Sequence, residues 1–397
     1  MMCQTNGLGC AKISTGLLLD KMKKIKVAFC LRDMQMGGVE SVLVRTLDEL
    51  CKDKNFDVTV ITFVDLTEPL YIDWLKKHKN IKHFVLYPCK YLTTRMPHFF
   101  LWRVVKHWAR DVYRFICRNF CVAKKLCDFD TLVDFHDFGF QKEFNKVKNI
   151  KKIAWFHSSV NVFIKRGFIN RVNDYDKVVV LTDDCVADLC DLYPVYAHKF
   201  IKLYNIIDCQ KIKEMAKEDS LVDGDYFCCV SRMSGDKDIK TVIDAFDCFC
   251  GYHKDMKLVL VGDGDKLKEY KKYVSVLDAA NKILFVGAQK NPYVYMAYAK
   301  ANILSSYGEG FALVLAEAQV LGIPNISSNC KYGPREILLD GRAGLLFEPG
   351  DVSGLAKHMV DVYEDNVDVK NMVKTATSNL ERFDKNKIIE KIKSLIS

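Results

Sequence analysis

Two acidic residues, Glu309 and Glu317, have seven residues between them in the stretch YGEGFALVLAEA (307–318). Gly308 and Gly310 flank the first acid, and the second falls in a run with helical periodicity, where we expect a helix that starts near Phe311. A glycine turn that leads into a helix presents free backbone N–H groups, and these attract an anion. The two carboxylates are therefore spaced to hold opposite ends of one elongated ligand whose anionic part lies at the helix start.

A second candidate site lies in VSRMSGDKDIKTVIDAF (230–246), where Arg232 and Lys237 follow an apolar run and precede a helix. Two cations at the end of a strand, beside a helix N-terminus, can clamp a diphosphate, because arginine offers a fork of donors and lysine a point charge. A solvated basic loop explains this stretch alone equally well.

A third glycine turn occurs in MQMGGVES (34–41), where Gly37 and Gly38 follow the first strand-like run. Glycine lets the backbone approach a ligand closely, and the following residues open a helix. Taken alone, the pair is more simply explained as a tight turn between a strand and a helix.

The elements that would position these residues are short apolar runs alternating with helix-length segments, a pattern that predicts parallel sheets built from strand–helix–strand units. We predict an α/β protein with two doubly wound, Rossmann-like domains facing a central cleft, where ligands bind at the carboxyl ends of the strands. The expected strands are 24–31, 57–63, 81–87, 130–135, 152–157, 177–182 and 200–205, then 226–232, 256–262, 282–287, 301–306, 324–328 and 343–347.

The predicted boundaries follow changes in composition along the chain. Residues 1–21 are interpreted as a disordered extension, and 22–207 as a first Rossmann-like domain. The polar stretch 208–225 is expected to be the linker to a second Rossmann-like domain over 226–380. A last helix within 381–397 is expected to cross back to the first domain.

The composition narrows the class of protein. With 59 Lys and Arg against 50 Asp and Glu, the net charge of +9 is too small to indicate nucleic acid, but it suits a phosphate-bearing ligand or an anionic membrane surface. The 16 scattered cysteines are typical of reduced cysteine in the cytosol. The sequence contains no apolar run of about 18 residues or more, so it predicts no membrane span. No metal site is predicted, and DFHD (134–137) and TDD (182–184) are interpreted as turn and loop acids.

The stretch 99–125 carries two stripes at helical spacing, one apolar and one basic. One interpretation is a helix whose apolar face packs on the first sheet while its basic face is solvated. The other is an interfacial helix on the anionic inner leaflet of a membrane. The sequence leaves both open.

Six stretches of the chain, taken together, point to one family. They are GEGFALVLAEAQVLGIPNISSN, YGPREIL, GLLFEPGD, SRMSGDKD, NIID and GGVE. These stretches closely resemble the retaining glycosyltransferases of family 4, which have the GT-B fold. The resemblance runs from about residue 25 and is strongest over 226–350. YGPREIL and WFHSS are more similar to the capsule and lipopolysaccharide members than to the starch and sucrose enzymes. The loop 235–238 departs from the family, reading Gly-Asp-Lys-Asp where Pro-Glu-Lys-Gly is usual.

The resemblance implies a role for each candidate residue. Glu317 would hold the ribose hydroxyls of the donor, and Glu309 the hydroxyls of its sugar. Arg232 and Lys237 would bind the diphosphate. The remaining donor contacts would come from the backbone of Gly310, Phe311 and Ala312, from Gly37 and Gly38 of the opposite domain, and from His157 in WFHSS.

We therefore expect a retaining, metal-independent glycosyltransferase that needs no cofactor and uses a nucleoside-diphosphate sugar, with a UDP-sugar favoured. The expected acceptor is a glycan or a lipid-linked molecule in surface-polysaccharide assembly, reached from the cytoplasm or from the inner leaflet. Two alternatives are a sugar-nucleotide epimerase on the same fold, whose family lacks this spacing of glutamates, and a non-catalytic sugar-nucleotide-binding protein.

Overall fold

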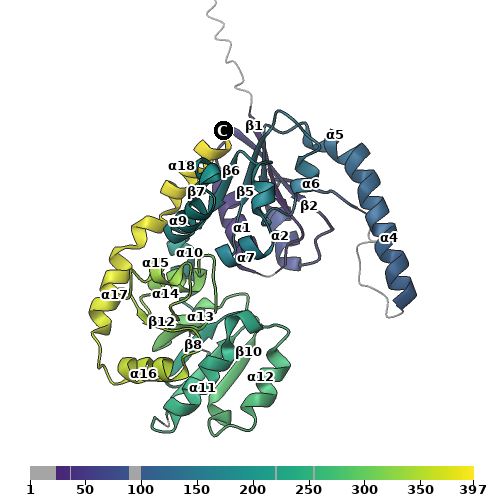
Figure 1. The fold of residues 1–397 in the computed structure, drawn as a ribbon. Coiled ribbons are helices and arrows are strands. Elements are labelled where there is room, and N and C mark those ends of the chain that lie inside the picture. The colour runs from purple at the N-terminus through teal and green to yellow at the C-terminus, as the bar shows by residue number, and fades with distance from the viewer. Residues whose placement is uncertain (1–23, 36, 89–99, 220, 254) are drawn as a thin grey trace, which may run out of the picture.

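The computed structural model describes residues 24–35, 37–88, 100–219, 221–253 and 255–397. The extension expected over 1–21 lies outside this part of the chain. Within it, the strands form two separate parallel sheets, one in each half (Figure 1). The doubly wound α/β architecture expected from the alternating apolar runs is confirmed.

The first sheet has seven strands in the order β3-β2-β1-β4-β5-β6-β7, all pairing in parallel. Its central strands are almost entirely buried because helices cover both faces, which explains their continuous apolar runs. The strands are β1 Ile25–Leu31, β2 Phe56–Thr62, β3 Lys82–Val85, β4 Thr131–Asp134, β5 Lys151–Trp155, β6 Lys177–Val180 and β7 Phe200–Lys202.

The second sheet has six parallel strands in the order β10-β9-β8-β11-β12-β13. Both sheet orders reverse direction beside their first strand, and a ligand site is expected at such a switch point. The strands are β8 Tyr226–Val230, β9 Lys257–Val261, β10 Ile283–Gly287, β11 Ala301–Leu304, β12 Asn325–Ser328 and β13 Leu345–Phe347.

Helices flank both sheets (Figure 1). In the first half they are α1 Gly38–Leu50, α2 Pro69–Lys77, α4 Phe100–Cys117, α5 Ala123–Leu126, α6 Gln141–Phe144, α7 Val160–Lys165, α8 Ile169–Val172 and α9 Asp183–Leu192. In the second half they are α10 Cys209–Met215, α11 Ile239–Cys250, α12 Leu267–Val274, α13 Tyr293–Met296, α14 Leu313–Leu321, α15 Pro334–Ile337, α16 Val352–Tyr363, α17 Val369–Ser378 and α18 Lys385–Ile396.

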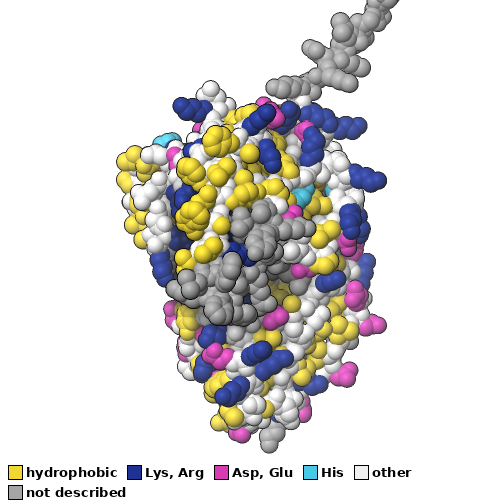
Figure 2. All heavy atoms as spheres, turned by 90° about the vertical axis from the view of Figure 1, so that its right-hand side faces the viewer, with side chains coloured by type: hydrophobic (Ala, Val, Ile, Leu, Met, Phe, Trp, Pro, Cys, Tyr) yellow, Lys and Arg dark blue, Asp and Glu magenta, His cyan; other side chains and the backbone are white. Residues whose placement is uncertain are grey.

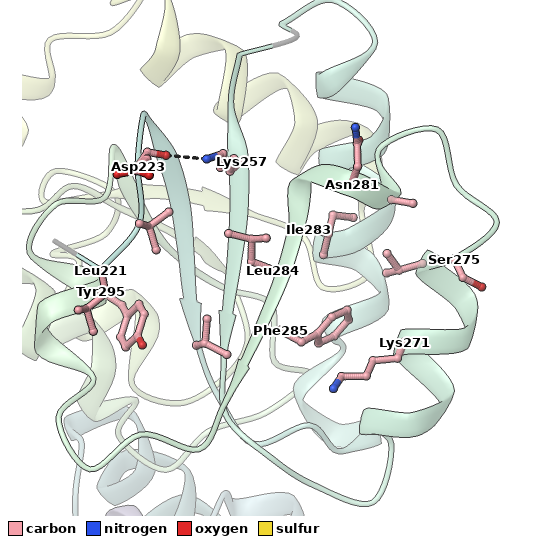
Figure 3. A pocket seen from close by; sticks show the side chains of 14 residues that line it. Leu221, Asp223, Lys257, Lys271, Ser275, Asn281, Ile283, Leu284, Phe285 and Tyr295 are labelled. Atoms are coloured by element: carbon pink, nitrogen blue, oxygen red, sulfur yellow. Dashed lines mark hydrogen bonds between the residues drawn. The ribbon is translucent and has the colours of Figure 1, made fainter.

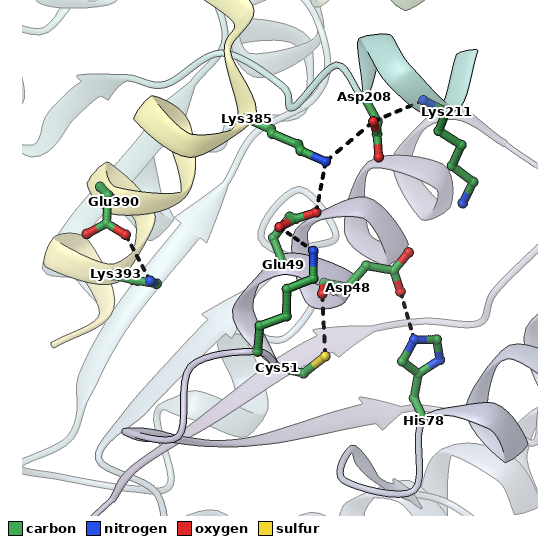
Figure 4. Close-up of polar contacts among 10 residues, drawn as sticks. Asp48, Glu49, Cys51, His78, Asp208, Lys211, Lys385, Glu390 and Lys393 are labelled. Atoms are coloured by element: carbon green, nitrogen blue, oxygen red, sulfur yellow. Dashed lines mark hydrogen bonds and ion pairs between the residues drawn. The ribbon is translucent and has the colours of Figure 1, made fainter. Parts of the chain in front are cut away.

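The chain crosses between the domains twice. The stretch 208–225 contains α10, which packs against α14, and α18 returns to lie on the N-terminal domain beside α1 (Figure 1). Lys385 bridges Glu49 of α1 and Asp208 at 3.4 and 3.5 Å (Figure 4). At the far end of α18, the Ile396 carbonyl accepts a 2.8 Å hydrogen bond from the Thr131 hydroxyl in β4.

Helix α4 lies at the side of the N-terminal domain with its apolar face turned outward (Figures 1 and 2). Trp108 is 70% exposed and Phe115 63%, and Phe120 just beyond the helix is 75% exposed. The polar side faces the domain, where Arg118 forms a 3.0 Å ion pair with the buried Glu143. The interpretation that the apolar face packs on the sheet is therefore wrong, because periodicity identifies a face but not what covers it.

Candidate functional site

The loop that carries Glu309 approaches the N-terminal domain very closely. A Cβ atom on Gly310 would lie 1.9 Å from the His157 carbonyl oxygen, so only glycine fits there. The following helix begins at Leu313, two residues later than expected near Phe311, because Ala312 takes a left-handed φ of 58°. The Phe311 ring packs away from this loop, between Tyr204 and Phe383.

Glu309 and Lys237 form an ion pair in the C-terminal domain. Lys237 Nζ lies 2.6 Å from Glu309 Oε1, and the Ser306 hydroxyl donates to the same oxygen at 2.5 Å. Ser305 donates to the Lys237 carbonyl at 2.8 Å, which ties the lysine loop to the end of β11. The structure therefore brings together two residues that are 72 positions apart in the sequence.

The loop between β8 and α11 holds the two predicted cations in different environments. Lys237 is partly buried, whereas Arg232 is exposed at the end of β8. Asp238 has a left-handed φ of 48°, and its carboxylate accepts a 2.7 Å hydrogen bond from Thr241. Asp238 occupies the position where the family usually has glycine, and aspartate tolerates this conformation better than most residues.

His157 follows β5 and faces the Gly310 loop. Its backbone N–H donates to Asp137 Oδ1 at 2.7 Å, and the Ser158 hydroxyl donates to Asp137 Oδ2 at 2.6 Å. Burial lowers the pKa of His157 to about 4, so the ring is neutral near pH 7. Its Nε2 atom is buried and has no hydrogen-bond partner among the described residues. A buried polar atom normally has a partner, so an unpaired ring nitrogen is consistent with one that binds a hydroxyl group of a ligand.

The acids of the DFHD stretch have roles that sequence reasoning missed. Asp137 holds the His157 segment, as described above. Asp134 is the last residue of β4 and fully buried, so it is not a loop acid. It accepts hydrogen bonds from the Phe140 backbone at 2.8 Å and from the Tyr175 hydroxyl at 2.6 Å. Both carboxylates therefore shape the strand ends of the N-terminal domain.

The glycine turn of the N-terminal domain lies at the start of α1. Gly38 faces α14, and a Cβ atom on it would stand 3.2 Å from Leu313 Cδ1. Gly37 precedes the helix in an extended conformation that any residue adopts. Nearby, Glu40 is an acid that sequence reasoning did not single out. Burial, together with a smaller effect of the nearby Asp33, raises its pKa to about 7, although Arg232 of the other domain opposes this rise.

Glu317 lies on the buried side of α14 and is 8% exposed. Arg45 of α1 forms a 2.7 Å ion pair with it, and the Tyr293 hydroxyl donates to the same carboxylate at 3.0 Å. No sequence motif points to Arg45, which is one basic residue in an otherwise ordinary amphipathic helix. Its partner is 272 positions away.

The candidate site is therefore the junction of Gly310, Glu309, Lys237 and His157, with Gly38 on its N-terminal side. Within the described ranges, no group of three histidine, cysteine or acidic residues stands where it could hold a metal ion. The most prominent open pocket, about 960 Å³ along edge strand β10, is lined by Phe285, Tyr295 and their neighbours and is not part of this site (Figure 3).

A family model and several curated proteins match parts of the chain. Residues 210–379 match the family model of the glycosyl transferases group 1. An N-acetylgalactosaminyltransferase of Campylobacter jejuni that acts on a diphospho-undecaprenol-linked sugar is 27% identical over 57% of this chain and 64% of that enzyme. A lipopolysaccharide 1,6-galactosyltransferase of Salmonella typhimurium is 30% identical over 36% of this chain and 41% of that enzyme. The chain thus matches less than two thirds of the length of either enzyme.

Solved structures match nearly the whole chain. HepE of Anabaena, in complex with UDP and glucose, has a TM-score of 0.73 at 18% identity, covering 93% of this chain and 98% of that one. TarM of S. aureus, in a complex that contains UDP, has a TM-score of 0.75 at 15% identity and covers 95% of this chain and 100% of that one. At this identity the likeness establishes the fold.

The two parallel-sheet domains have the GT-B fold of these solved structures. Residues 210–379, which contain Lys237, Glu309 and Glu317, are similar to the glycosyl transferases of group 1. The resemblance noted in the sequence is thereby confirmed. The roles assigned to individual residues stay predictions.

The raised pKa of Glu40 predicts a pH-dependent stability. Between pH 4.5 and about 7 the unfolded chain releases this proton while the folded chain keeps it, so the contribution of Glu40 to stability falls as pH rises through that window. Glu40→Gln should therefore increase the free energy of unfolding at pH 8 by roughly 3 kcal/mol at most and so raise the Tm at that pH. At pH 4.5 it should change the Tm little. Thermal unfolding at both pH values is the measurement.

Glu269→Gln, at a 64% exposed position on α12, is the control and should leave both Tm values unchanged. Equal shifts at the two pH values in Glu40→Gln would contradict the assignment of the proton to Glu40.

Proposed function

We propose that this protein is a retaining glycosyltransferase that transfers a sugar from a UDP-sugar to a glycan or lipid-linked acceptor in surface-polysaccharide assembly. The observation that carries the proposal is the Lys237–Glu309 pair beside the close contact of Gly310 with His157. It brings a cation and an acid of the C-terminal domain next to the backbone of the N-terminal segment that carries the neutral His157 ring. The HepE and TarM complexes that contain UDP support the choice of base.

In this proposal the two cations stabilise the leaving group. As the bond to the sugar breaks, negative charge develops on the nucleoside diphosphate, and cations fixed in advance stabilise it without reorganisation. Lys237 is held by Glu309 and by its own backbone contact with Ser305. Arg232, at the end of β8, is exposed, so its side chain can change conformation to contact the phosphate of the diphosphate that is bonded to the sugar.

The retained configuration is proposed to result from attack on the same face as the leaving group. Glu309 is engaged by Lys237 and Ser306 and is assigned to the donor-sugar hydroxyls, not to a nucleophilic role. The leaving phosphate would then accept the proton of the acceptor hydroxyl. The neutral His157 ring, with its unpaired Nε2, would orient a hydroxyl of the donor sugar.

Removal of either cation should slow turnover. Lys237→Ala and Arg232→Ala are each expected to lower kcat by about 10²-fold or more, because charge stabilisation in the transition state is lost. The measurement is steady-state transfer from UDP-sugars to an acceptor. Lys240→Ala is the matched control, since this lysine is 54% exposed on α11 and pairs with Asp244. Near-normal rates in both test variants would remove the diphosphate assignment.

The proposed chemistry assigns the cationic role to side chains, so transfer should not depend on a divalent ion. Activity in excess EDTA is expected to equal activity in buffer. Loss of activity on EDTA treatment, with recovery on addition of Mg²⁺ or Mn²⁺, would show that a metal ion stabilises the leaving group.

The outward face of α4 supports a peripheral position on an anionic membrane. Val105, Trp108, Val112 and Ile116 keep helical spacing and are 37–70% exposed, so the helix presents an apolar stripe to its surroundings. Basic residues such as Arg110 and Arg114 line its other side. An apolar face combined with a basic polar face is the pattern of an interfacial helix. None of the described helices is long and apolar enough to cross a membrane.

Replacement of the apolar side chains of this stripe should release the protein from vesicles. The triple variant Trp108→Ser, Phe115→Ser, Phe120→Ser removes three side chains that are 63–75% exposed. Sedimentation with vesicles of anionic lipid should fall at least tenfold, while transfer to a soluble acceptor analogue is unchanged. Parent binding should also weaken in 1 M salt, where the Debye length is about 3 Å.

Val195→Ser is the control, because this residue is 77% exposed on a different part of the N-terminal domain. If the triple variant sediments as the parent does, α4 is not a membrane contact. A parent chain that dimerises through α4, with a triple variant that is monomeric, would assign this face to a second copy instead.

A further inference from the structure

Arg45 reaches across the domain interface to the second acid of the glutamate pair. Its Nη2 atom donates to Glu317 Oε1 at 2.7 Å and to the Tyr293 hydroxyl at 2.9 Å. The Tyr293 hydroxyl in turn donates to the same Oε1 at 3.0 Å. The side chains of Arg45 and Glu317 are only 13% and 11% exposed. The three groups therefore form a closed, largely buried set that joins α1, α13 and α14.

The hydrogen bonds of this set are one-sided. Both donors use Oε1 of Glu317, and no described residue donates to Oε2. On the other side, Nη1 of Arg45 is buried and has no hydrogen-bond partner within the part of the chain that the structure describes. The buried, unpaired Nη1 is costly because it has lost its contact with water, whereas Oε2 is not among the buried unpaired atoms and stays open to a ligand. Such a set is completed by a ligand that offers both a donor and an acceptor.

A vicinal pair of hydroxyl groups has that chemistry. One hydroxyl can donate to Glu317 Oε2, and its oxygen or that of its neighbour can accept from Arg45 Nη1. A carboxylate that is already held on one oxygen presents the other in a fixed direction, so little rotational freedom is lost on binding. This argument rests on the proposed function, whose UDP-sugar donor carries the ribose that the family resemblance assigns to Glu317.

We propose that Arg45 is a positioning residue for ribose recognition. It fixes Glu317 through Oε1, leaves Oε2 for a ribose hydroxyl, and completes the pocket with Nη1. Because Arg45 belongs to the N-terminal domain and Glu317 to the C-terminal domain, this ribose contact is complete only while the two domains are together. Nucleotide recognition and domain contact are thus coupled through one guanidinium.

The domains are also held together by contacts that do not involve Arg45. The Asp183 backbone donates to Glu336 at 2.8 Å, and Lys385 bridges α18 to Glu49 of α1 at 3.4 Å. A change at residue 45 therefore tests the orientation of Glu317 while these other interdomain contacts remain.

The test compares nucleotides that differ only in the ribose. For the parent chain, UDP should bind about tenfold or more tightly than 2′-deoxy- or 3′-deoxy-UDP, measured by calorimetric titration. In Arg45→Met the preference for the ribose hydroxyl should fall to less than about twofold, with UDP itself weakened. Binding of inorganic pyrophosphate should be the same in both proteins, because Lys237 and Arg232 are untouched.

Tyr293→Phe provides a second variant that removes a single hydroxyl and keeps the buried ion pair. It should reduce the ribose preference in the same direction but by less. Lys52→Met is the control just beyond the end of α1, since Lys52 is 65% exposed and pairs with Glu49. It should bind all four probes as the parent does.

The outcomes separate the two levels of the proposal. If Arg45→Met keeps the full preference of the parent for the ribose hydroxyl, or if its pyrophosphate binding falls as much as its UDP binding, Arg45 does not position Glu317. If the parent binds UDP but does not distinguish the deoxy analogues, the ribose role is overturned while the proposed function stands. A parent that does not bind UDP contradicts the proposed function itself.

Discussion

The geometry of the site depends on the contact between the Gly310 backbone and the carbonyl of His157. There is no room for a Cβ atom at this point, so the two main chains, and not side chains, set the distance between the domains. Gly333 makes a similar contact within the C-terminal domain, where a Cβ would stand 2.8 Å from the backbone of Phe311. These two glycines fix the loop that holds Glu309, and through it the position of Lys237.

The two acids that attract notice in the sequence are both paired, but with cations of different origin. Glu309 pairs with Lys237 of its own domain, and Glu317 with Arg45 of the other. A partly buried carboxylate without a partner would be strongly destabilising, so each pairing is a condition for placing an acid there. The two acids, eight positions apart, therefore form one ion pair within the C-terminal domain and one between the domains.

Much of the fold could be predicted from the sequence because continuous apolar runs identify buried parallel strands. Each expected run overlaps an observed strand, and the loops with Lys237 and Glu309 lie at strand ends in both descriptions. The pairing of Arg45 with Glu317 could not be predicted, because no local spacing links residues 272 positions apart. The outward orientation of the apolar face of α4 could not be predicted either, since helical periodicity looks the same whether a protein or a membrane covers that face. The two-residue delay of α14 results from the left-handed Ala312, which no residue type signals.

The return of α18 to the N-terminal domain has a consequence for the order of folding. Ile388, Ile392 and Ile396 are almost completely buried, and the Ile396 carbonyl bonds to Thr131 in the middle of the first sheet. During synthesis the N-terminal domain emerges first, but its surface over this helix stays open until the whole C-terminal domain has been translated. An apolar strip of a nearly finished domain is therefore exposed on the ribosome for the time that about 180 residues take to appear, roughly 10 to 40 seconds at usual elongation rates. Chaperones that bind apolar surface would have their longest opportunity at this strip.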